Sequence, residues 1–370
     1  MQFIDLKKQQ DLIKDRISNR VNKVLDHGKY IMGPEVFELE EKLALFVNRK
    51  HCISCSSGTD ALLIPLMALN IGPGDAVLTT TFSYIATSEV VRLLGATPIF
   101  IDIYEKTYNI NPDLIENGVE IAKKSNLNPK ALIAVDLFGL PARYRLLKQA
   151  CEKYDLTLIE DSAQGFGGLI GDELACSFGD ISSTSFFPAK PLGCYGDGGA
   201  IFTNDDALAE KMKSIRVHGS GKDKYDNIRT GINGRLDTFQ AAILLEKLNI
   251  FPGEVIKRNQ KADKYSKNIS DSYIKPFVPQ NYTSSWAQYC ILASSVEHRD
   301  SVINHLKNKK IPVMIYYPIP LHEQTVNLDL KKTECPVASD ISKRIFSVPM
   351  HPYLEDEDQE IICMSLNEVR

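Results

Sequence analysis

In the first 160 residues, segments with apolar residues at helical spacing alternate with short apolar runs of strand length, which predicts helices alternating with strands. Between Glu35 and Val47 apolar residues recur at helical spacing, and His51–Ser54 is an apolar run of strand length. Such alternation indicates an α/β fold in which a mostly parallel sheet is covered on both faces. The expected strands that follow are 76–79, 98–103, 130–138 and 157–160, and the expected helices are 58–70, 87–94, 111–123 and 142–154.

The pattern changes after about residue 250. A charged helix is expected at 257–267, strands at 286–293 and 311–316, and a helix at 299–309. This mixture is typical of a smaller α+β domain, and a chain of 370 residues is long enough for one large domain and a smaller one. The sequence therefore predicts a large domain over residues 13–250 and a small C-terminal domain over 251–370, with residues 1–12 packing near the small domain.

Charge and targeting signals exclude two classes of partner. A net charge of −4 and a pI near 6.0 provide no basic field, so we expect no nucleic-acid partner. The N-terminus carries no apolar segment before a cleavage site, and no apolar run approaches the roughly 20 residues needed to span a bilayer. A cytoplasmic protein with no membrane partner is expected.

The eight cysteines are scattered, and most lie in apolar runs, as reduced core cysteines do. Cys52 and Cys55 form an isolated C-x-x-C motif. A zinc site would need a second pair or nearby histidines, and neither follows. We interpret the pair as core residues, and a metal or redox site is the alternative.

Lys190 lies in a stretch rich in proline and glycine, Ser185 to Ala200. The prolines fix the backbone angle φ, and the glycines allow backbone angles that are closed to other residues. The preceding Phe186, Phe187 and Pro188 make the approach to the amine apolar. Because desolvation makes lysines reactive, this favours an amine used for chemistry, such as a Schiff base with a carbonyl group. A surface lysine in a glycine-rich turn is the alternative.

A polar turn, Ser56 to Ala61, joins the first expected strand to the helix 58–70. Free N–H groups and the helix dipole at such a turn make a ready phosphate site, and simple helix capping is the alternative. Pro65 interrupts this helix and is expected to bend it, or to cost about 3 kcal/mol.

Asp161 closes the apolar strand 157–160, and an acid at the carboxyl end of a parallel strand points into the ligand crevice. A buried carboxylate there would need a cationic partner, such as a protonated pyridine nitrogen. A cap for the following segment is the alternative.

A basic segment, Arg216 to Arg235, has a net positive charge suited to phosphate or carboxylate, and a solvated loop is the alternative. Taken together, the turn, the acid, the lysine and the basic segment match the needs of pyridoxal 5′-phosphate. The turn would hold its phosphate, the acid would keep its ring nitrogen protonated, and the lysine would hold its carbonyl carbon.

These motifs, in this order, resemble the nucleotide-sugar aminotransferases of the DegT/DnrJ/EryC1/StrS family. The resemblance runs from Phe3–Leu6 to Tyr317–His322 and implies a fold-type-I (aspartate aminotransferase type) enzyme with a seven-stranded, mostly parallel sheet. It also implies a homodimer with active sites shared at the subunit interface. The motifs that carry it are Ser57–Thr59, Glu160–Gln164, Ser185 with Lys190, Gly196–Gly199 and Gly231–Asp237.

The resemblance also implies a role for each site residue. Lys190 would carry the cofactor and move the proton, and Asp161 would pair with the pyridinium nitrogen. Gln164 would contact the ring near its 3-oxygen, and Tyr84 would stack on the ring. The other implied contacts are Ser57, Gly58, Thr59 and Ser185 to the phosphate, Asn233 and Arg235 to the neighbouring subunit's site, and Tyr316, Tyr317 and His322 to the sugar nucleotide.

Within the nucleotide sugars, the resemblance implies a narrower class of substrate. The segments 30–36, 186–199 and 233–237 look most like the subgroup that aminates C3 of UDP-2-acetamido-3-keto-glucuronic acid for O-antigen or related glycans, with L-glutamate as donor. Arg229 or Arg235 is our candidate partner for the uronate carboxylate. The alternative is a TDP- or UDP-linked keto-6-deoxy sugar aminated at C3 or C4. A more remote alternative is a module that binds cofactor or sugar nucleotide without turnover; the retained lysine favours transamination.

Overall fold

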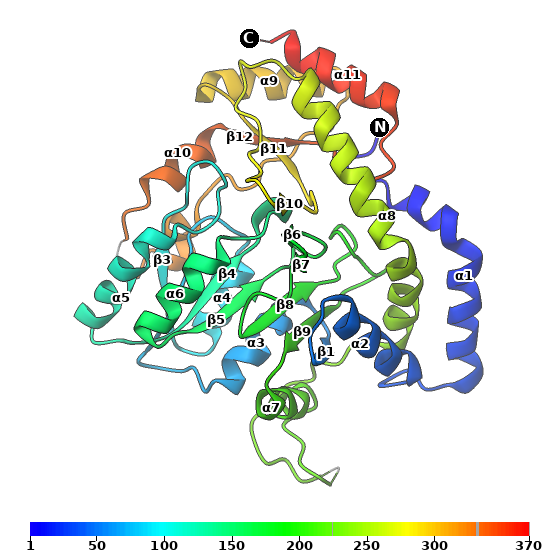
Figure 1. Ribbon diagram of the computed structural model, residues 1–370, viewed down its shortest axis with the longest axis vertical. Coiled ribbons are helices and arrows are strands. Elements are labelled where there is room, and N and C mark those ends of the chain that lie inside the picture. Colours follow the sequence, from blue (N-terminus) through cyan, green and yellow to red (C-terminus); the bar gives the residue numbers. More distant parts are fainter. Residues whose placement is uncertain (224, 331–332, 370) are drawn as a thin grey trace.

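A seven-stranded sheet forms the centre of this computed structural model, which describes residues 1–223, 225–330 and 333–369 (Figure 1). The strand order is β1-β9-β8-β5-β4-β2-β3. The strand β9 pairs antiparallel with β1 and with β8, and the other four pairs of this sheet are parallel, so the predicted α/β fold with a mostly parallel sheet is confirmed. The strands are β1 (His51–Cys55), β2 (Asp75–Thr80), β3 (Thr97–Ile101), β4 (Asn128–Val135), β5 (Thr157–Asp161), β8 (Ile181–Ser185) and β9 (Gly199–Thr203).

Helices cover both faces of this sheet, which explains why its strands read as continuous apolar runs. In β4, Leu132 packs toward α5 (Ile115–Lys124) and α6 (Tyr144–Tyr154), whereas its neighbour Ile133 packs toward α3 (Gly58–Ala68) and α4 (Ala86–Leu93). Successive side chains therefore enter two separate cores. The helices are α3, α4 and α7 (Asp206–Arg216) on one face, and α2 (Pro34–Phe46), α5 and α6 on the other.

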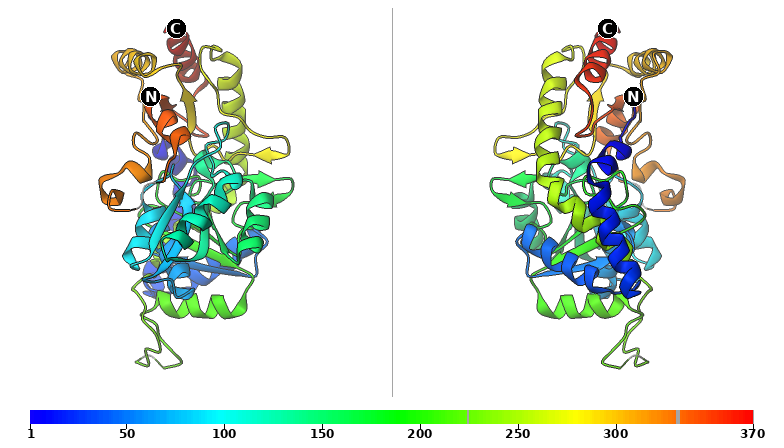
Figure 2. Two further views of the ribbon diagram at one scale, coloured as in Figure 1. Left: turned by 90° about the vertical axis from the view of Figure 1, so that its left-hand side faces the viewer. Right: turned by 90° about the vertical axis from the view of Figure 1, so that its right-hand side faces the viewer.

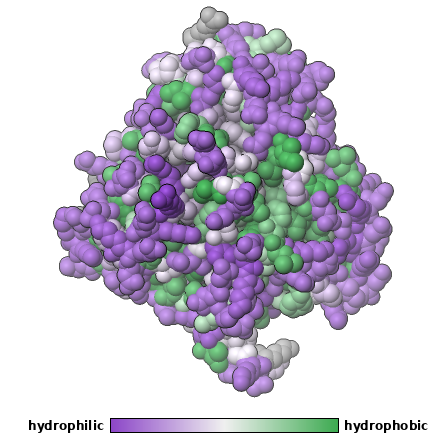
Figure 3. Space-filling model, viewed as in Figure 1, coloured by the Kyte–Doolittle hydropathy of each residue, from purple (hydrophilic) through white to green (hydrophobic). Residues whose placement is uncertain are grey.

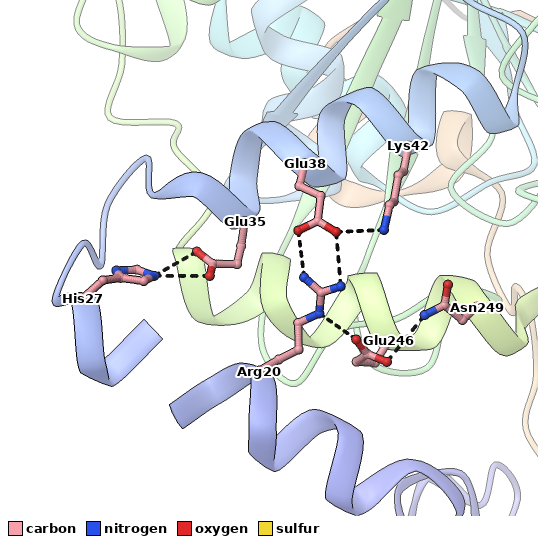
Figure 4. Close-up of polar contacts among 7 residues, drawn as sticks. All are labelled: Arg20, His27, Glu35, Glu38, Lys42, Glu246 and Asn249. Atoms are coloured by element: carbon pink, nitrogen blue, oxygen red, sulfur yellow. Dashed lines mark hydrogen bonds and ion pairs between the residues drawn. The ribbon is translucent and has the colours of Figure 1, made fainter. Parts of the chain in front are cut away.

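Two long helices, α1 (Leu6–His27) and α8 (Thr238–Asn268), lie side by side along one edge of the molecule (Figure 2). Arg20 of α1 joins them to α2. Its guanidinium donates to Glu246 of α8 at 2.6 Å and to both oxygens of Glu38 at 2.7 and 3.1 Å (Figure 4). Lys42 also donates to Glu38, at 2.7 Å, so the network ties three helices that are distant in sequence.

The C-terminal part packs around a second, smaller core that includes the far end of α8 (Figure 1). Its elements are β11 (Tyr289–Leu292), β12 (Ile345–Val348), α9 (Val296–Asn308), α10 (Pro336–Arg344) and α11 (Asp356–Asn367). Three short strands, β6 (Leu169–Ile170), β7 (Glu173–Leu174) and β10 (Tyr282–Thr283), form a separate small sheet. Short 3-10 helices are η1 (Pro112–Leu114), η2 (Leu137–Gly139), η3 (Leu321–Glu323) and η4 (Thr325–Asn327).

Three predicted strands need correction. The strand expected at 130–138 ends at Val135, because residues 137–139 form η2 and Phe138 has φ of 58°. The strand expected at 286–293 shrinks to β11, because Trp286 also has a positive φ. The strand expected at 311–316 is wrong: it makes only an isolated bridge at Met314, since Pro312 has no N–H to donate to a ladder. Pro65, in contrast, lies buried within an uninterrupted α3.

The division at residue 250 falls inside α8, which continues through it and absorbs the helix expected at 257–267. The two-domain boundary therefore stays a prediction. The first residues contact the C-terminal part, where Lys8 pairs with Glu355 at 2.6 Å and the ring of Phe3 lies 6.3 Å from that of Tyr316.

The face of the molecule in Figure 3 is mainly hydrophilic, with apolar residues scattered over it. Among the described residues, every helix falls short of the length and apolar character that crossing a membrane requires. The eight cysteines are all free and buried. Burial raises the pKa of the thiols of both Cys52 and Cys55, which agrees with their interpretation as core residues.

Candidate active site

The carboxyl ends of two neighbouring strands bring the predicted site residues together. Asp161 ends β5 and Ser185 ends β8, and these strands pair in parallel, with Asp161 in register with Ser183. The start of α3 approaches Ser185 from the same edge of the sheet. Ligands of such sheets bind at this edge, so the fold places the predicted acid and hydroxyl at the same edge of the sheet.

The first turn of α3 carries the residues predicted to hold a phosphate, called here the cup. Ser57 is its N-cap, and its hydroxyl accepts from the backbone N–H of Asp60 at 3.0 Å. The first helical hydrogen bond runs from Ala61 to Ser57, so the N–H groups of Gly58 and Thr59 precede it and point off the helix end. These groups and the helix dipole can bind a phosphate dianion, which is how the cup fits the cofactor.

Gly58 is required at this position by close packing. A Cβ built on it would lie 2.6 Å from Cβ and 2.9 Å from Oγ of Ser185, closer than any side chain tolerates. Only glycine therefore lets the helix start touch β8. The contact places the Ser185 hydroxyl beside the free N–H groups of the cup.

Asp161 is buried and held in a fixed orientation. Its carboxylate accepts from the hydroxyl of Thr87 and from the backbone N–H of Ala163, both at 3.1 Å. Burial raises the pKa of the carboxyl above its ordinary value, while the Ala163 N–H and the charge of Lys190 act in the opposite direction. A further positive charge at this edge of the sheet, such as a pyridinium, would stabilise the ionised form.

Lys190 lies near enough to Asp161 that each group shifts the other's pKa. Burial lowers the pKa of the Lys190 amine, and the charge of Asp161 only partly offsets this. In the loop that carries the lysine, the backbone of Gly193 packs against that of Pro188, and a Cβ on Gly193 would lie 2.5 Å from the carbonyl oxygen of Pro188. The loop thus holds an amine that loses its proton more readily than an exposed lysine does.

Gln164 is also fixed. Its amide oxygen accepts from the backbone N–H of Phe138 at 2.8 Å, and its Nε2 donates to the hydroxyl of Tyr317 at 3.2 Å. The contact brings residue 317 of the C-terminal part to the turn after β5. Burial raises the pKa of the Tyr317 phenol, so it stays protonated and can donate in turn.

Three further predicted residues lie at the end of β2 or in the segment beside it. Tyr84 follows β2 and is 57% exposed, which leaves its ring available to a ligand. Nδ1 of His322 lies 2.5 Å from the hydroxyl of Thr81, and burial lowers the pKa of this histidine. The ring of Tyr316 packs against that of Tyr317, at 5.8 Å between centroids.

The basic segment is divided: its end returns to the cup, where the backbone N–H of Ser56 donates to the carbonyl oxygen of Gly234 at 3.0 Å, but its middle leaves the body. The loop after α7 projects away from the body, as Figures 1 and 2 show. Arg229 is partly buried and Asn233 exposed, and neither is among the described partners of Asp161. Nε of Arg235 is buried without a hydrogen-bond partner among the described residues. Lys224, which contributes to the charge of this segment, lies outside the described residues.

Two residues of the site were not found from the sequence. Thr87, the partner of Asp161, lies on α4, 74 positions earlier, and carries no local signal. Asp136 follows β4 as Asp161 ends β5, so an acid after an apolar strand was an available signal.

Comparisons with known proteins agree with this geometry. The family model described as "DegT/DnrJ/EryC1/StrS aminotransferase family" matches residues 11–367. The chain is 46% identical over 367 residues to the UDP-2-acetamido-2-deoxy-3-oxo-D-glucuronate aminotransferase of Pseudomonas aeruginosa, covering 99% of each chain. The fold matches a DegT DnrJ EryC1 StrS aminotransferase from Brucella abortus with a TM-score of 0.97 and 45% identity, covering 100% of this chain and 99% of that one. It also matches NtdA from Bacillus subtilis with bound cofactor PMP, with a TM-score of 0.87 and 28% identity, covering 96% and 81%.

Proposed function

The chain belongs to the DegT/DnrJ/EryC1/StrS aminotransferase family, and from this premise we propose that it transfers the amino group of L-glutamate to C3 of UDP-2-acetamido-2-deoxy-3-keto-glucuronic acid. It is a nucleotide-sugar aminotransferase that uses pyridoxal 5′-phosphate. The observation that carries the choice of sugar is the 46% identity, over 99% of both chains, to the Pseudomonas aeruginosa enzyme. The product would serve O-antigen or related surface-glycan synthesis in the cytoplasm.

The described residues fit the cofactor. The N–H groups of Gly58 and Thr59, with the hydroxyls of Ser57 and Ser185, would hold its phosphate. Tyr84 would stack on its ring. When bound, the cofactor supplies an electron sink that lets an amino group leave one carbon and join another.

Asp161 would keep a proton on the ring nitrogen, and Gln164 would orient the ring near its 3-oxygen. Lys190 would hold the cofactor and then move a proton between the donor's α-carbon and the cofactor. The depressed pKa of Lys190 supports this role, because a general base must be unprotonated near the working pH. Tyr316, Tyr317 and His322 would line the sugar-nucleotide site.

A uronate substrate needs a cation, and Arg229 or Arg235 is our candidate. The Nε of Arg235 that lacks a partner among the described residues supports an acceptor supplied from outside the chain, either a substrate or a second subunit. We propose a homodimer in which Asn233 and Arg235 reach the partner's site. If Arg235→Ala left the apparent affinity for the uronate unchanged, that role would be wrong for Arg235.

One experiment tests the reaction and the sugar together. The purified enzyme is converted with L-glutamate to its amine form, separated from the donor, and mixed with a panel of 3-keto and 4-keto nucleotide sugars. Return of the aldehyde absorbance is expected with the 3-keto-glucuronate. A faster return with a keto-6-deoxy sugar would replace the proposed substrate by the alternative, and no bleaching by any amino donor would favour a non-catalytic binding module.

A further inference from the structure

Two buried carboxyl groups share a single hydroxyl directly behind Asp161. Oγ of Ser162 lies 2.5 Å from Oδ2 of Asp136 and 2.7 Å from Oε1 of Glu160. All three residues are fully buried, or nearly so. A serine hydroxyl carries one proton and can donate to only one acceptor at a time. The second contact therefore requires a proton that comes from one of the two carboxyl groups.

The remaining contacts decide which carboxyl carries that proton. Glu160 accepts from the backbone N–H groups of Cys176, Phe178 and Gly179 at 2.5, 2.7 and 3.1 Å and from the hydroxyl of Ser182 at 2.7 Å. With donors on both oxygens, Glu160 is stabilised as an anion. It also lies near the positive charge of Arg49.

Asp136 has the opposite arrangement. The backbone N–H of Ala142, at 3.0 Å, and the hydroxyl of Tyr144, at 2.7 Å, both donate to its Oδ1. Within the described part of the chain, its Oδ2 has the Ser162 hydroxyl as its one hydrogen-bond partner, so this oxygen can carry a proton and donate it. Ser162 then accepts from Asp136 and donates to Glu160, which satisfies all three groups with the protons available.

We propose that Asp136 is a protonated carboxylic acid in the native protein at neutral pH, and that through Ser162 it positions the turn carrying Asp161 and Gln164. The turn lies against it: a Cβ on Gly165 would be 2.3 Å from Cβ of Asp136, so the acid packs directly under the turn. The backbone N–H of Asp136 also donates to the carbonyl oxygen of Asp161, at 3.0 Å.

The electrostatics of the surrounding groups agree with this assignment. Burial and the charge of Glu160 raise the pKa of Asp136 well above its ordinary value, and burial keeps the Tyr144 phenol and the Cys176 thiol protonated. Glu160 already raises the pKa of Asp161. A second negative charge at Asp136 would raise it further, so that Asp161 would itself take up a proton more readily.

The protonation of Asp136 is tested without reference to turnover. Infrared spectra of the holoenzyme at pH 7 are recorded for the wild type, Asp136→Asn and, as a matched control on an exposed aspartate, Asp155→Asn. The wild type minus Asp136→Asn difference should show the C=O stretch of a carboxylic acid, and the control difference should show only ionised carboxylate bands. Loss of a carboxylate band in Asp136→Asn would overturn the proposal. If that variant fails to fold, the wild-type carboxylic-acid band is followed from about pH 5 to about pH 8, and its disappearance below neutrality would do the same.

The positioning role rests on the proposed function and is tested by cofactor affinity. Asparagine can accept at Oδ1 and donate to Ser162 from Nδ2, as the protonated acid does, whereas alanine can do neither. Asp136→Ala and Ser162→Ala should each weaken pyridoxal phosphate binding about tenfold, and Asp136→Asn should restore most of it. Equal weakening by Asp136→Asn and Asp136→Ala would refute this role. Neither measurement uses a sugar, so failure here leaves the proposed substrate untouched.

Discussion

Replacing Gly58 by alanine tests whether the start of α3 and Ser185 form the phosphate cup. The added methyl would lie 2.6 Å from Cβ of Ser185, and ordinary contact begins near 3.4 Å, so the two segments must separate by roughly 0.8 Å. Ser185 belongs to a fully buried strand, which leaves little room to yield. Overpacking of this kind costs about 1–3 kcal/mol of stability.

The larger effect is expected on the cofactor. Moving the N–H groups of the cup away from the Ser185 hydroxyl forfeits about one hydrogen bond to a charged phosphate, worth about 1.5–3 kcal/mol, or about a 10- to 150-fold loss of affinity. The assay is titration of the apoenzyme with pyridoxal phosphate, followed by absorbance. Gly72→Ala is the matched control, because its Cβ would meet nothing closer than 3.9 Å. If Gly58→Ala bound the cofactor as tightly as Gly72→Ala, the assignment of the cup would be refuted.

Three further variants probe Lys190 and two charged side chains elsewhere in the fold, Lys247 and Arg20. Lys190→Ala should lose the lysine-bound cofactor absorbance and essentially all turnover, and full activity would contradict its assignment. Lys247 is buried with its Nζ 4.3 Å from the centroid of the Tyr195 ring, and burial lowers its pKa to about 8. In the unfolded chain this amine keeps its proton up to about pH 10.4, so the free energy of unfolding of the wild type should rise between about pH 8 and pH 10.4. Lys247→Met should abolish that rise. In denaturant titrations at pH 7 the variant should be more stable by about 1–2 kcal/mol, which includes the loss of the cation–π contact. Arg20→Met should cost about 1–2 kcal/mol at pH 7, since these partly exposed pairs are screened (Figure 4). Arg20 lowers the pKa of Glu38, so the stabilisation from that pair is complete above about pH 4.3 and is lost as the pH falls through the lower native pKa. If the stability lost in Arg20→Met stayed the same in acid, this explanation would be contradicted.

The chemistry of the site was accessible from the sequence because its main groups lie in short local motifs. A lysine among prolines and glycines, an acid ending an apolar strand and a polar turn before a helix each have a local physical meaning. Strand periodicity was equally local, and it predicted β1 to β5 of the central sheet but neither β8 nor β9. It failed at 311–316, where the run is apolar throughout but Pro312 removes a donor and only Met314 reaches a bridge partner.

The sequence already pointed to Asp161 as the acid facing a ligand, and the tertiary structure added what its neighbour Glu160 contacts. Glu160 and Asp161 are neighbours in the sequence, and successive side chains of a strand point to opposite faces, so one is enclosed by backbone donors and the other lies near Lys190. The proton on Asp136 follows from contacts with residues up to 26 positions away. The sequence by itself determined the chemical groups and the family. The charge that each group carries depends on burial and on partners distant in the chain, which only the folded structure brings within hydrogen-bonding distance.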